Sequence, residues 1–427
     1  MSFRSDFREL LRFGDQAEKC LKCGLCLYYC PVFREEHDES LVARGRNKLI
    51  TELLSRQVDL TKEFDGNLGL CLACKRCSMF CPAGIHADQI MLALRADLVR
   101  ERGLSLPKKA AYRWLIPYRQ RFARLLKLAA KFQWFLPAYE GDFKRLPLFL
   151  SPLGKGRYVP HIASTSLIDQ VPSVVPLPPG TQVKMRVGFF VGCVFNFIWP
   201  EIGKSIINFL VKNGVEVVIP KEQGCCGMPI SGAGDFETAR FLADNTVSVF
   251  SDLDFVVTGC ATCSSALKHY QIYLADTEER VKSYGEFTAK VRDLTEFLVD
   301  DLKLPVSAYG TRHGESLRIT YHDPCHLARY QNIVKQPRKI LNSIGGLEFV
   351  EMEGADDCCG MGGAFSIYHY QLSQAIADRK IDLIKKTSAD IVVTTCPGCM
   401  IQLQDSLLRH KMPQKVLHLA QLLNGEI

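Results

Sequence analysis

Hydrophobic and polar positions in the second half of the chain follow two alternating patterns. Short apolar runs such as 183–192 and 254–259 predict buried strands. Longer segments such as 201–214 and 235–253 place apolar residues at helical spacing. Strands that alternate with helices predict parallel α/β units. The same series recurs after residue 317, and a longer helix is predicted over 277–302 between the two series.

The first half of the chain has helical patterns without strands. A short helix is predicted within 1–19, and an amphipathic helix within 40–56. The pattern over 86–103 predicts a helix that ends at Gly103. The Pro-, Ser- and Gly-rich stretches 146–160 and 171–180 predict an irregular linker.

These patterns, with the cysteine motifs described below, divide the 427 residues into four parts. We expect an N-terminal α-helical module and an α/β C-terminal half made of two repeated units with parallel strands. The parts are 1–103, the N-terminal module; 104–182, a basic helical connector and linker; 183–310, the first repeat; and 311–427, the second repeat.

Charge is concentrated in the connector. Residues 101–160 carry 13 Lys and Arg against 3 Asp and Glu, whereas the whole chain has a net charge of +7. The segment 108–135 predicts a basic amphipathic helix for a membrane surface or an acidic partner; the alternative is a helix whose apolar face covers its own protein. No base-reading module accompanies this charge, so we expect no nucleic-acid partner.

The chain begins without an apolar signal segment and contains no run of 18 apolar residues. We therefore expect a cytoplasmic protein, either soluble or peripheral on the inner face of the cytoplasmic membrane.

Eight of the 18 cysteines form two copies of the pattern C-x2-C-x2-C-x3-C-P. This is the bacterial ferredoxin pattern for cubane [4Fe–4S] clusters, in which the fourth cysteine binds the other cluster. We therefore expect residues 1–103 to form a ferredoxin-like module with di-cluster binding. Zinc is the alternative, although zinc ligands usually come as separated Cys-x-x-Cys pairs. The predicted ligands are Cys20, Cys23, Cys26 and Cys81 for one cluster, and Cys71, Cys74, Cys77 and Cys30 for the other.

The other ten cysteines form two matching sets, each a single Cys, a Cys-Cys-Gly and a Cys-x-x-Cys. Each group follows a predicted strand, where open α/β sheets build ligand sites. A thiolate pattern repeated in register predicts a duplicated metal site; zinc or reduced core cysteines are the alternatives. The sets are Cys193, Cys225, Cys226, Cys260 and Cys263, and Cys325, Cys358, Cys359, Cys396 and Cys399.

Several polar residues lie close to these cysteines in sequence. Arg44 and Arg46 follow the first motif, where positive charge near an anionic cluster would raise its potential; the alternative is a solvated helix face. His322, Asp323 and His326 flank Cys325. They are candidate proton donors for catalysis, and the alternative is hydrogen bonding that orients the cysteine loop.

The two sets resemble the CCG cysteine-rich domain of heterodisulfide reductase and of the iron–sulfur subunits of glycolate oxidase and D-lactate dehydrogenase. The whole chain resembles these subunits in its order of paired ferredoxin motifs, basic connector and two CCG repeats. The resemblance implies two cubane clusters and one or two noncubane [4Fe–4S] clusters. No G-x-G-x-x-G opens a helix after a strand, so we expect no flavin or NAD on this chain.

The resemblance implies two alternative functions. As an electron relay, the chain would pass electrons between an FAD-containing 2-hydroxyacid dehydrogenase subunit and a quinone, a membrane cytochrome subunit or another acceptor. As a reductase, it would cleave a disulfide between two noncubane clusters. Two complete cysteine sets favour the reductase, whereas the spacer Ala43–Arg46 favours the glycolate-oxidase type and hence the relay.

Overall fold

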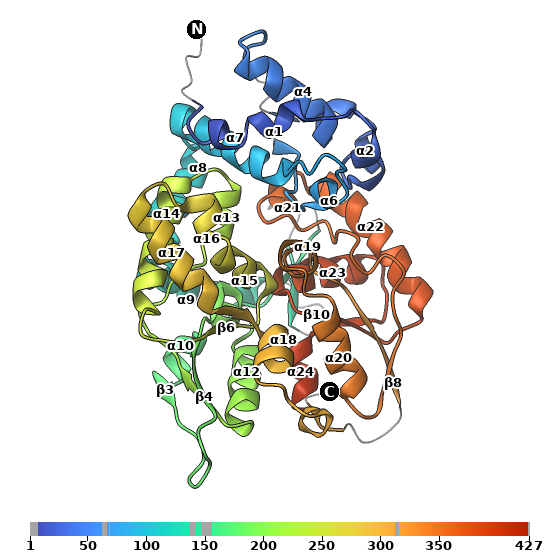
Figure 1. The fold of residues 1–427 in the computed structure, drawn as a ribbon. Helices are drawn as coiled ribbons and strands as arrows, with labels where there is room; N and C mark the ends of the chain where they lie inside the picture. The colour runs from blue at the N-terminus through green and yellow to red at the C-terminus, as the bar shows by residue number, and fades with distance from the viewer. Residues whose placement is uncertain are drawn as a thin grey trace.

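Parallel sheets form the centre of both repeats in the C-terminal half (Figure 1). The structure is a computed structural model that describes residues 7–61, 66–67, 69–136, 142–146, 156–311 and 316–425. The N-terminal helical module lies across one end of the two repeats, which stand side by side.

The first repeat has the strand order β3-β5-β4-β6-β7 within the described residues. All pairs are parallel except the edge pair of β3 and β5. The strands are β3 (Val174–Val175), β4 (Met185–Phe189), β5 (Val215–Val218), β6 (Val256–Thr258) and β7 (Val291–Asp293).

The second repeat has the order β11-β10-β8-β9, and every pair in it is parallel. This order matches β7-β6-β4-β5 of the first repeat, so the two units share one topology and the predicted fold class is confirmed. The strands are β8 (Leu317–Tyr321), β9 (Leu347–Phe349), β10 (Ile391–Thr394) and β11 (Lys415–His418).

Helices cover the sheets and follow the predicted apolar spacing. In α12, for example, Ile202, Ile206 and Phe209 are at most 1% exposed because they share the face that meets the sheet. The first repeat has α11 (Gly192–Phe197), α12 (Pro200–Lys212), α13 (Met228–Gly232), α14 (Phe236–Val249), α15 (Ala261–Lys268), α16 (Tyr270–Leu274), α17 (Glu278–Lys290) and α18 (Leu294–Glu296). The second has α19 (Cys325–Gln331), α20 (Lys335–Ser343), α21 (Phe365–Tyr368), α22 (Tyr370–Thr387), α23 (Pro397–Arg409) and α24 (Leu419–Leu423).

Three short strands of the two repeat sheets were missed by the sequence patterns, as were the two connector strands at Phe143–Arg145 and Tyr158–Pro160, the second of them inside the stretch 146–160 that was predicted to be irregular. The predicted helix over 277–302 ends at Lys290, because Val291 begins β7 and pairs with β6. Asp293 then caps α18 by accepting a hydrogen bond from the Thr295 N–H at 2.9 Å. Strand β11 was also not predicted, and β3 lies inside the stretch 171–180 that was predicted to be irregular.

The N-terminal module packs α4 (Ala43–Leu54) against α7 (Ala87–Arg102), and both helices lie where they were predicted. Asp97 of α7 fixes the start of the described chain by accepting the backbone N–H groups of Glu9 at 3.1 Å and Leu10 at 2.7 Å. Shorter elements carry the cysteine loops: Leu10–Arg12, α1 (Asp15–Glu18), α2 (Leu25–Tyr29), α3 (Phe33–Glu36), Glu39–Leu41 and α6 (Arg76–Met79).

The connector contacts both repeats. Its β1–β2 hairpin packs on the second repeat, where the Tyr158 N–H donates to Asp405 at 2.8 Å. Its α10 packs on the first repeat, where the Ile168 N–H donates to Asn196 at 3.0 Å. The elements are α8 (Leu106–Lys109), a π-helix (Ala110–Leu115), α9 (Arg119–Phe132), a 3-10 turn (Gln133–Phe135), β1 (Phe143–Arg145), β2 (Tyr158–Pro160) and α10 (Leu167–Gln170). Part of the Pro- and Gly-rich stretch, residues 147–155, lies outside the described residues.

The two repeats pack on each other through matching elements. Helix α24 of the second repeat packs on α12 of the first, and α18 of the first packs on α20 of the second. Asn424 donates to the hydroxyl and carbonyl of Ser205 at 2.7 and 2.8 Å. His418 hydrogen-bonds the carbonyl of Gly259 at 2.9 Å, directly beside the first Cys-x-x-Cys. The repeats therefore form one continuous core, with the cysteine loops at their interface.

Candidate metal centres

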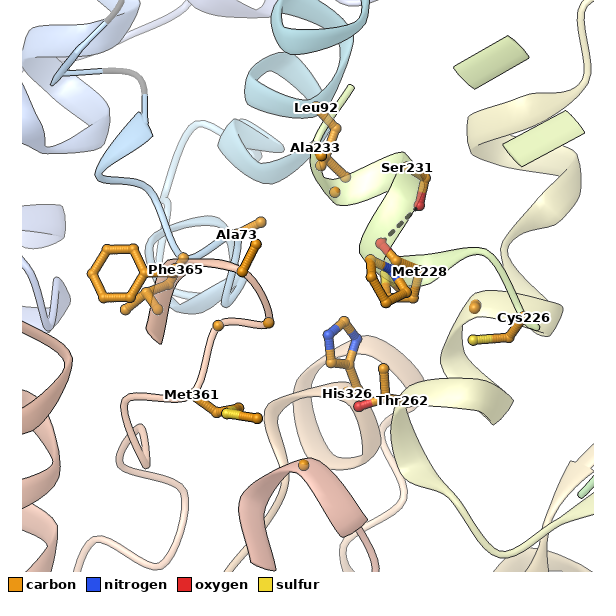
Figure 2. A pocket seen from close by; sticks show the side chains of 18 of the residues that line it. Ala73, Leu92, Cys226, Met228, Ser231, Ala233, Thr262, His326, Met361 and Phe365 are labelled. Atoms are coloured by element: carbon orange, nitrogen blue, oxygen red, sulfur yellow. Dashed lines mark hydrogen bonds between the residues drawn. The ribbon is translucent and has the colours of Figure 1, made fainter. Parts of the chain in front are cut away.

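A single cavity of about 730 Å³ lies between the two repeats and the N-terminal module. All ten cysteines of the two CCG-like sets line it. Figure 2 shows its walls: Ala73 and Leu92 come from the N-terminal module, Cys226 and Met228 from the first repeat, and Met361 from the second. The three loops of each repeat converge as predicted, but the two convergence points share one space.

In the first set, each cysteine group follows the carboxyl end of a strand, and backbone N–H groups point toward sulfur. The Gly227 N–H lies 3.5 Å from Cys225 Sγ, and the Cys263 N–H lies 3.4 Å from Cys260 Sγ at the start of α15. Such donors stabilise negative charge on a thiolate. Gly192 has φ +72° and lies so close that a Cβ there would sit 3.1 Å from Cys263 Sγ.

The second set repeats this arrangement. The Gly360 N–H lies 3.4 Å from Cys358 Sγ, and Cys396 stands directly before α23 at its N-cap position, although its side chain makes no capping hydrogen bond there. Cys359 and Cys399 have their sulfurs 3.4 Å apart without a disulfide. One ring nitrogen of His322 joins these two sulfurs in a group whose atoms all lie within 4.8 Å of one another.

The two sets meet where their Cys-x-x-Cys loops touch. The Thr262 hydroxyl lies 3.2 Å from Cys396 Sγ, and the Ala261 N–H donates to the carbonyl of Thr395 at 3.0 Å. Each loop is thus braced by the other repeat. A molecule in the cavity would contact cysteine loops of both repeats.

The ferredoxin-type cysteines surround two separate small hollows. One is lined by Cys30, Cys71, Cys74 and Cys77, and the other by Cys20, Cys23, Cys26 and Cys81, with Cys77 at its edge. The structure therefore brings together the two groups of four that the motif pattern predicts. Cys71 and Cys74 also line the central cavity, so the first hollow adjoins it.

Arg44 and Arg46 lie beside different hollows. Arg44 lines the hollow of Cys20 and pairs with Glu39 at 2.6 Å. Arg46 is 4% exposed and lines the hollow of Cys30, with its Nε unpartnered among the described residues. Burial is the largest effect on Cys30 and raises the pKa of its thiol to about 11. The positive charge of Arg46 acts in the opposite direction. Arg46 is therefore a buried cation at a cysteine site, not part of a solvated helix face.

The three polar residues around Cys325 have different environments. Asp323 forms a bidentate pair with Arg338 at 3.0 and 2.7 Å. His326 is held by the Ser265 hydroxyl at 3.2 Å, and burial lowers the pKa of His326 to about 4, which keeps its ring neutral. His322 is 1% exposed, and both of its ring nitrogens lack a hydrogen-bond partner among the described residues. One of these ring nitrogens lies within 4.8 Å of the sulfurs of Cys359 and Cys399.

The donor chemistry fits iron–sulfur clusters. All 18 cysteines, each of which the structure describes, are free thiols grouped in fours and fives. Burial raises the pKa of Cys325 to about 12, so this thiol loses its proton only when a strong positive charge beside it stabilises the thiolate. A metal ion supplies that charge and deprotonates a coordinating thiol outright.

Two arginines in the cavity wall, Arg95 and Arg329, were missed by the sequence analysis. Arg95 of α7 donates to the carbonyls of Cys71 at 2.6 Å and Gly232 at 3.0 Å, and so joins the N-terminal module to the first repeat. Arg329 of α19 donates to the carbonyl of Cys74 at 2.8 Å and joins the same loop to the second repeat. The sequence contained one signal for Arg329: it lies four residues after Cys325, on the same helical face.

Family comparisons agree with this architecture. The cysteine-rich domain CCG matches residues 187–268 and 319–404, and the 4Fe-4S dicluster domain matches residues 16–85. The chain is 30% identical to the "Probable glycolate oxidase iron-sulfur subunit" of Bacillus subtilis over 98% of this chain and 96% of that protein. This chain belongs to the CCG-domain iron–sulfur subunit family.

The family has members in different oxidoreductases. The chain is 29% identical to one of the subunits of the fumarate reductase (CoM/CoB) of Methanothermobacter marburgensis, over 95% of this chain and 71% of that protein. It is 34% identical to "Lactate utilization protein A" of Geobacillus kaustophilus, over 56% of this chain and 99% of that protein. Membership makes this chain an iron–sulfur component of an oxidoreductase. Among the residues that the structure describes, no helix is long and apolar enough to cross a bilayer.

Proposed function

We propose that this chain is the electron-transfer subunit of a flavin-dependent 2-hydroxyacid dehydrogenase, acting on glycolate or lactate. The flavin would reside on a separate FAD-containing subunit, and the final acceptor would be a quinone, a membrane cytochrome or another carrier. One observation carries this proposal: the eighteen free thiols line sites that adjoin one another. Cys71 and Cys74, for example, line both a ferredoxin-type hollow and the central cavity. The names of the glycolate oxidase and lactate utilization relatives support the substrate class.

The proposed ligands follow the grouping of the thiols. Cys20, Cys23, Cys26 and Cys81 would hold one cubane cluster, and Cys71, Cys74, Cys77 and Cys30 the other. Each CCG set would hold a noncubane cluster. When bound, these clusters accept and donate single electrons. The chain's own part is to space the thiols, shield them from water and surround them with N–H donors and arginines that stabilise negative charge.

Purified anaerobically, the chain should contain about 16 irons, four per cluster, and little zinc. The decisive assay mixes it with an FAD-containing glycolate or lactate dehydrogenase and follows bleaching of its visible absorbance. Bleaching should need both the hydroxyacid and the flavoprotein. Turnover of glycolate or lactate by this chain alone would refute the proposal.

The cavity favours a second candidate, reduction of a disulfide. Both CCG sets are complete, and they face one space of about 730 Å³, which is a volume large enough for a small molecule. A reductase would consume a panel of organic disulfides with a reduced viologen dye as the electron source. Activity lost in both Cys226→Ala and Cys359→Ala would establish this alternative, whereas no consumption with any disulfide would exclude it for the panel tested.

We also propose that the connector rests on an anionic membrane surface. Every side chain of α9 is at least partly exposed, and the exposed set combines Leu125, Leu128 and Phe132 with Arg121 and Arg124. At 100° per residue these positions share one side of the helix. A different side packs on the protein, where the Phe122 ring meets Phe197 edge-on at 5.4 Å. An apolar strip with basic residues and no acidic ones fits a lipid surface.

A further inference from the structure

The two CCG repeats share their backbone topology but differ in the residues around their cysteines. Three residues before the single cysteine, the first repeat has Phe190 and the second has His322. Four residues after it, the first repeat has Phe197 and the second has Arg329. Phe197 packs in an apolar cluster with Phe122, so the first set lacks a cation at this position.

Arg329 is buried at the junction between the second set and the ferredoxin-type cysteines. Its side chain is 1% exposed and lines the central cavity. Nε donates to the carbonyl of Cys74 at 2.8 Å, and Nη1 donates to the carbonyl of Asp356 at 2.5 Å. Nη2 is buried and has no hydrogen-bond partner among the described residues. A guanidinium with one unused donor in a thiol-lined cavity is placed to serve a negatively charged occupant.

The charges around Arg329 leave a positive excess. Asp356 accepts from Arg329 at 3.2 Å and lies 3.7 Å from Arg76. Asp357 pairs with Arg76 and lies 3.6 Å from Arg34. Three arginines therefore share two aspartates in this network, and only Arg329 lies on the cavity wall.

The thiols near Arg329 belong to the second set and the N-terminal module. Burial would lower the pKa of Arg329, but Cys74, Cys325 and Cys358 outweigh it and raise that pKa above its ordinary value. Arg329 therefore lies between the second set and the ferredoxin-type cysteines, with its Nε bonded to the carbonyl of Cys74 and its side chain on the cavity wall.

We propose that Arg329 is a positioning residue that raises the reduction potential of the iron–sulfur site held by the second set and makes the two sets electrochemically unequal. A reduced cluster carries one more negative charge than an oxidised one, so a nearby fixed cation favours reduction. This inference rests on the proposed function only in placing a cluster at each set.

The test is an EPR-monitored redox titration of the anaerobically purified holoprotein. The signal lost in Cys399→Ala identifies the second set. Arg329→Gln removes the charge and keeps an amide donor, whereas Arg329→Lys keeps the charge. The control Tyr330→Phe removes a neighbouring uncharged hydroxyl, which donates to the carbonyl of Ala73 at 2.7 Å. Arg329→Gln should disfavour reduction of the second set at least tenfold, about 59 mV for one electron. Arg329→Lys should restore most of this, and Tyr330→Phe should cause no shift.

An unshifted reduction potential in Arg329→Gln, with full iron content, would overturn the inference. A reduction potential that falls as far in Arg329→Lys as in Arg329→Gln would also overturn it. Loss of second-set iron in Arg329→Gln would also overturn it, since Arg329 would then only hold the site together. If wild-type protein lacked second-set iron, the proposed function would fail first, and metal analysis of the same samples shows which of the two has failed.

Discussion

Binding of α9 to an anionic membrane can be tested by reversing its exposed charges. The chosen residues are Arg121, Arg124 and Lys131, which are exposed. Arg113 is unsuitable because it pairs with Asp235 at 2.9 Å, and Lys127 pairs with Asp169 at 3.1 Å. Changing the three residues to Glu therefore alters the surface without breaking these two ion pairs.

The expected magnitude follows from the number of charges and the exposed apolar side chains. Each Lys or Arg near an anionic leaflet contributes about 1 kcal/mol, so losing three positive charges costs about 3 kcal/mol, roughly a hundredfold in partitioning. This is a lower bound, because the three new Glu side chains also repel the leaflet. Leu125, Leu128 and Phe132 are 47%, 52% and 58% exposed. Burying their free halves in lipid contributes about 1 kcal/mol each, so changing all three to Ser should weaken binding by a similar factor.

The assay is co-sedimentation with vesicles of phosphatidylcholine alone or mixed with phosphatidylglycerol. Wild-type protein should bind only the mixed vesicles, and 0.5 M salt should weaken binding because it screens surface charge. A control variant with Lys282, Lys339 and Lys411 changed to Glu has the same net charge, with exposed residues taken from outside α9. Equal binding by the α9 variant and this control would refute the reasoning, and the basic face would then fit an acidic protein partner.

Three further predictions concern the clusters and the fold. Cys30→Ala and Cys81→Ala should each lose about four irons from different clusters, so their EPR spectra should lack different signals; loss of the same signal would contradict the crossed ligand sets. Burial lowers the pKa of His418 to about 4, against about 6.5 in the unfolded chain. The unfolded state therefore binds more protons between pH 6.5 and 4, and about 3 kcal/mol of stability should be lost as the pH falls through that window. Urea unfolding of wild type and His418→Gln checks this, and parallel pH profiles would contradict it. Phe209→Ala should lower the free energy of unfolding by about 3–5 kcal/mol, because Phe209 is 1% exposed and stacks on Tyr309. Phe241 is 52% exposed, so Phe241→Ala should lower it by less than about 0.5 kcal/mol. Equal melting temperatures of the two variants would contradict the packing argument.

Apolar runs and helical spacing predicted most elements of the two repeats. Strands β4, β6, β8 and β10 follow short apolar runs, and α12 and α7 follow helical patterns. Strands β7 and β11 were missed because their short sequences include charged or polar residues, and they gain their stability by pairing with β6 and β10. The grouping of the cysteines came from spacing alone, because ferredoxin ligands follow a fixed local pattern.

The relation between the sites could not be predicted from local patterns. The sequence indicated one metal site per repeat, and the shared cavity arises from contacts such as Ala261 to Thr395, 134 positions apart. Arg329 resembles an ordinary helical arginine until its hydrogen bond to Cys74, 255 positions away, is known. Burial depends on tertiary packing, so the distinction between His322, near two cysteine sulfurs, and Asp323, paired with Arg338, also required the structure.

The reciprocal packing of α24 on α12 and of α18 on α20 has a consequence for how this architecture can grow. Such an interface is isologous, as in a two-fold dimer: each unit offers the same face and receives the same face in return. A solenoid adds repeats because each unit leaves a free face for the next. Here each repeat buries its packing face against the other repeat, so no such face is left for a third repeat. The two cysteine sets therefore face one shared interior instead of lying in a row.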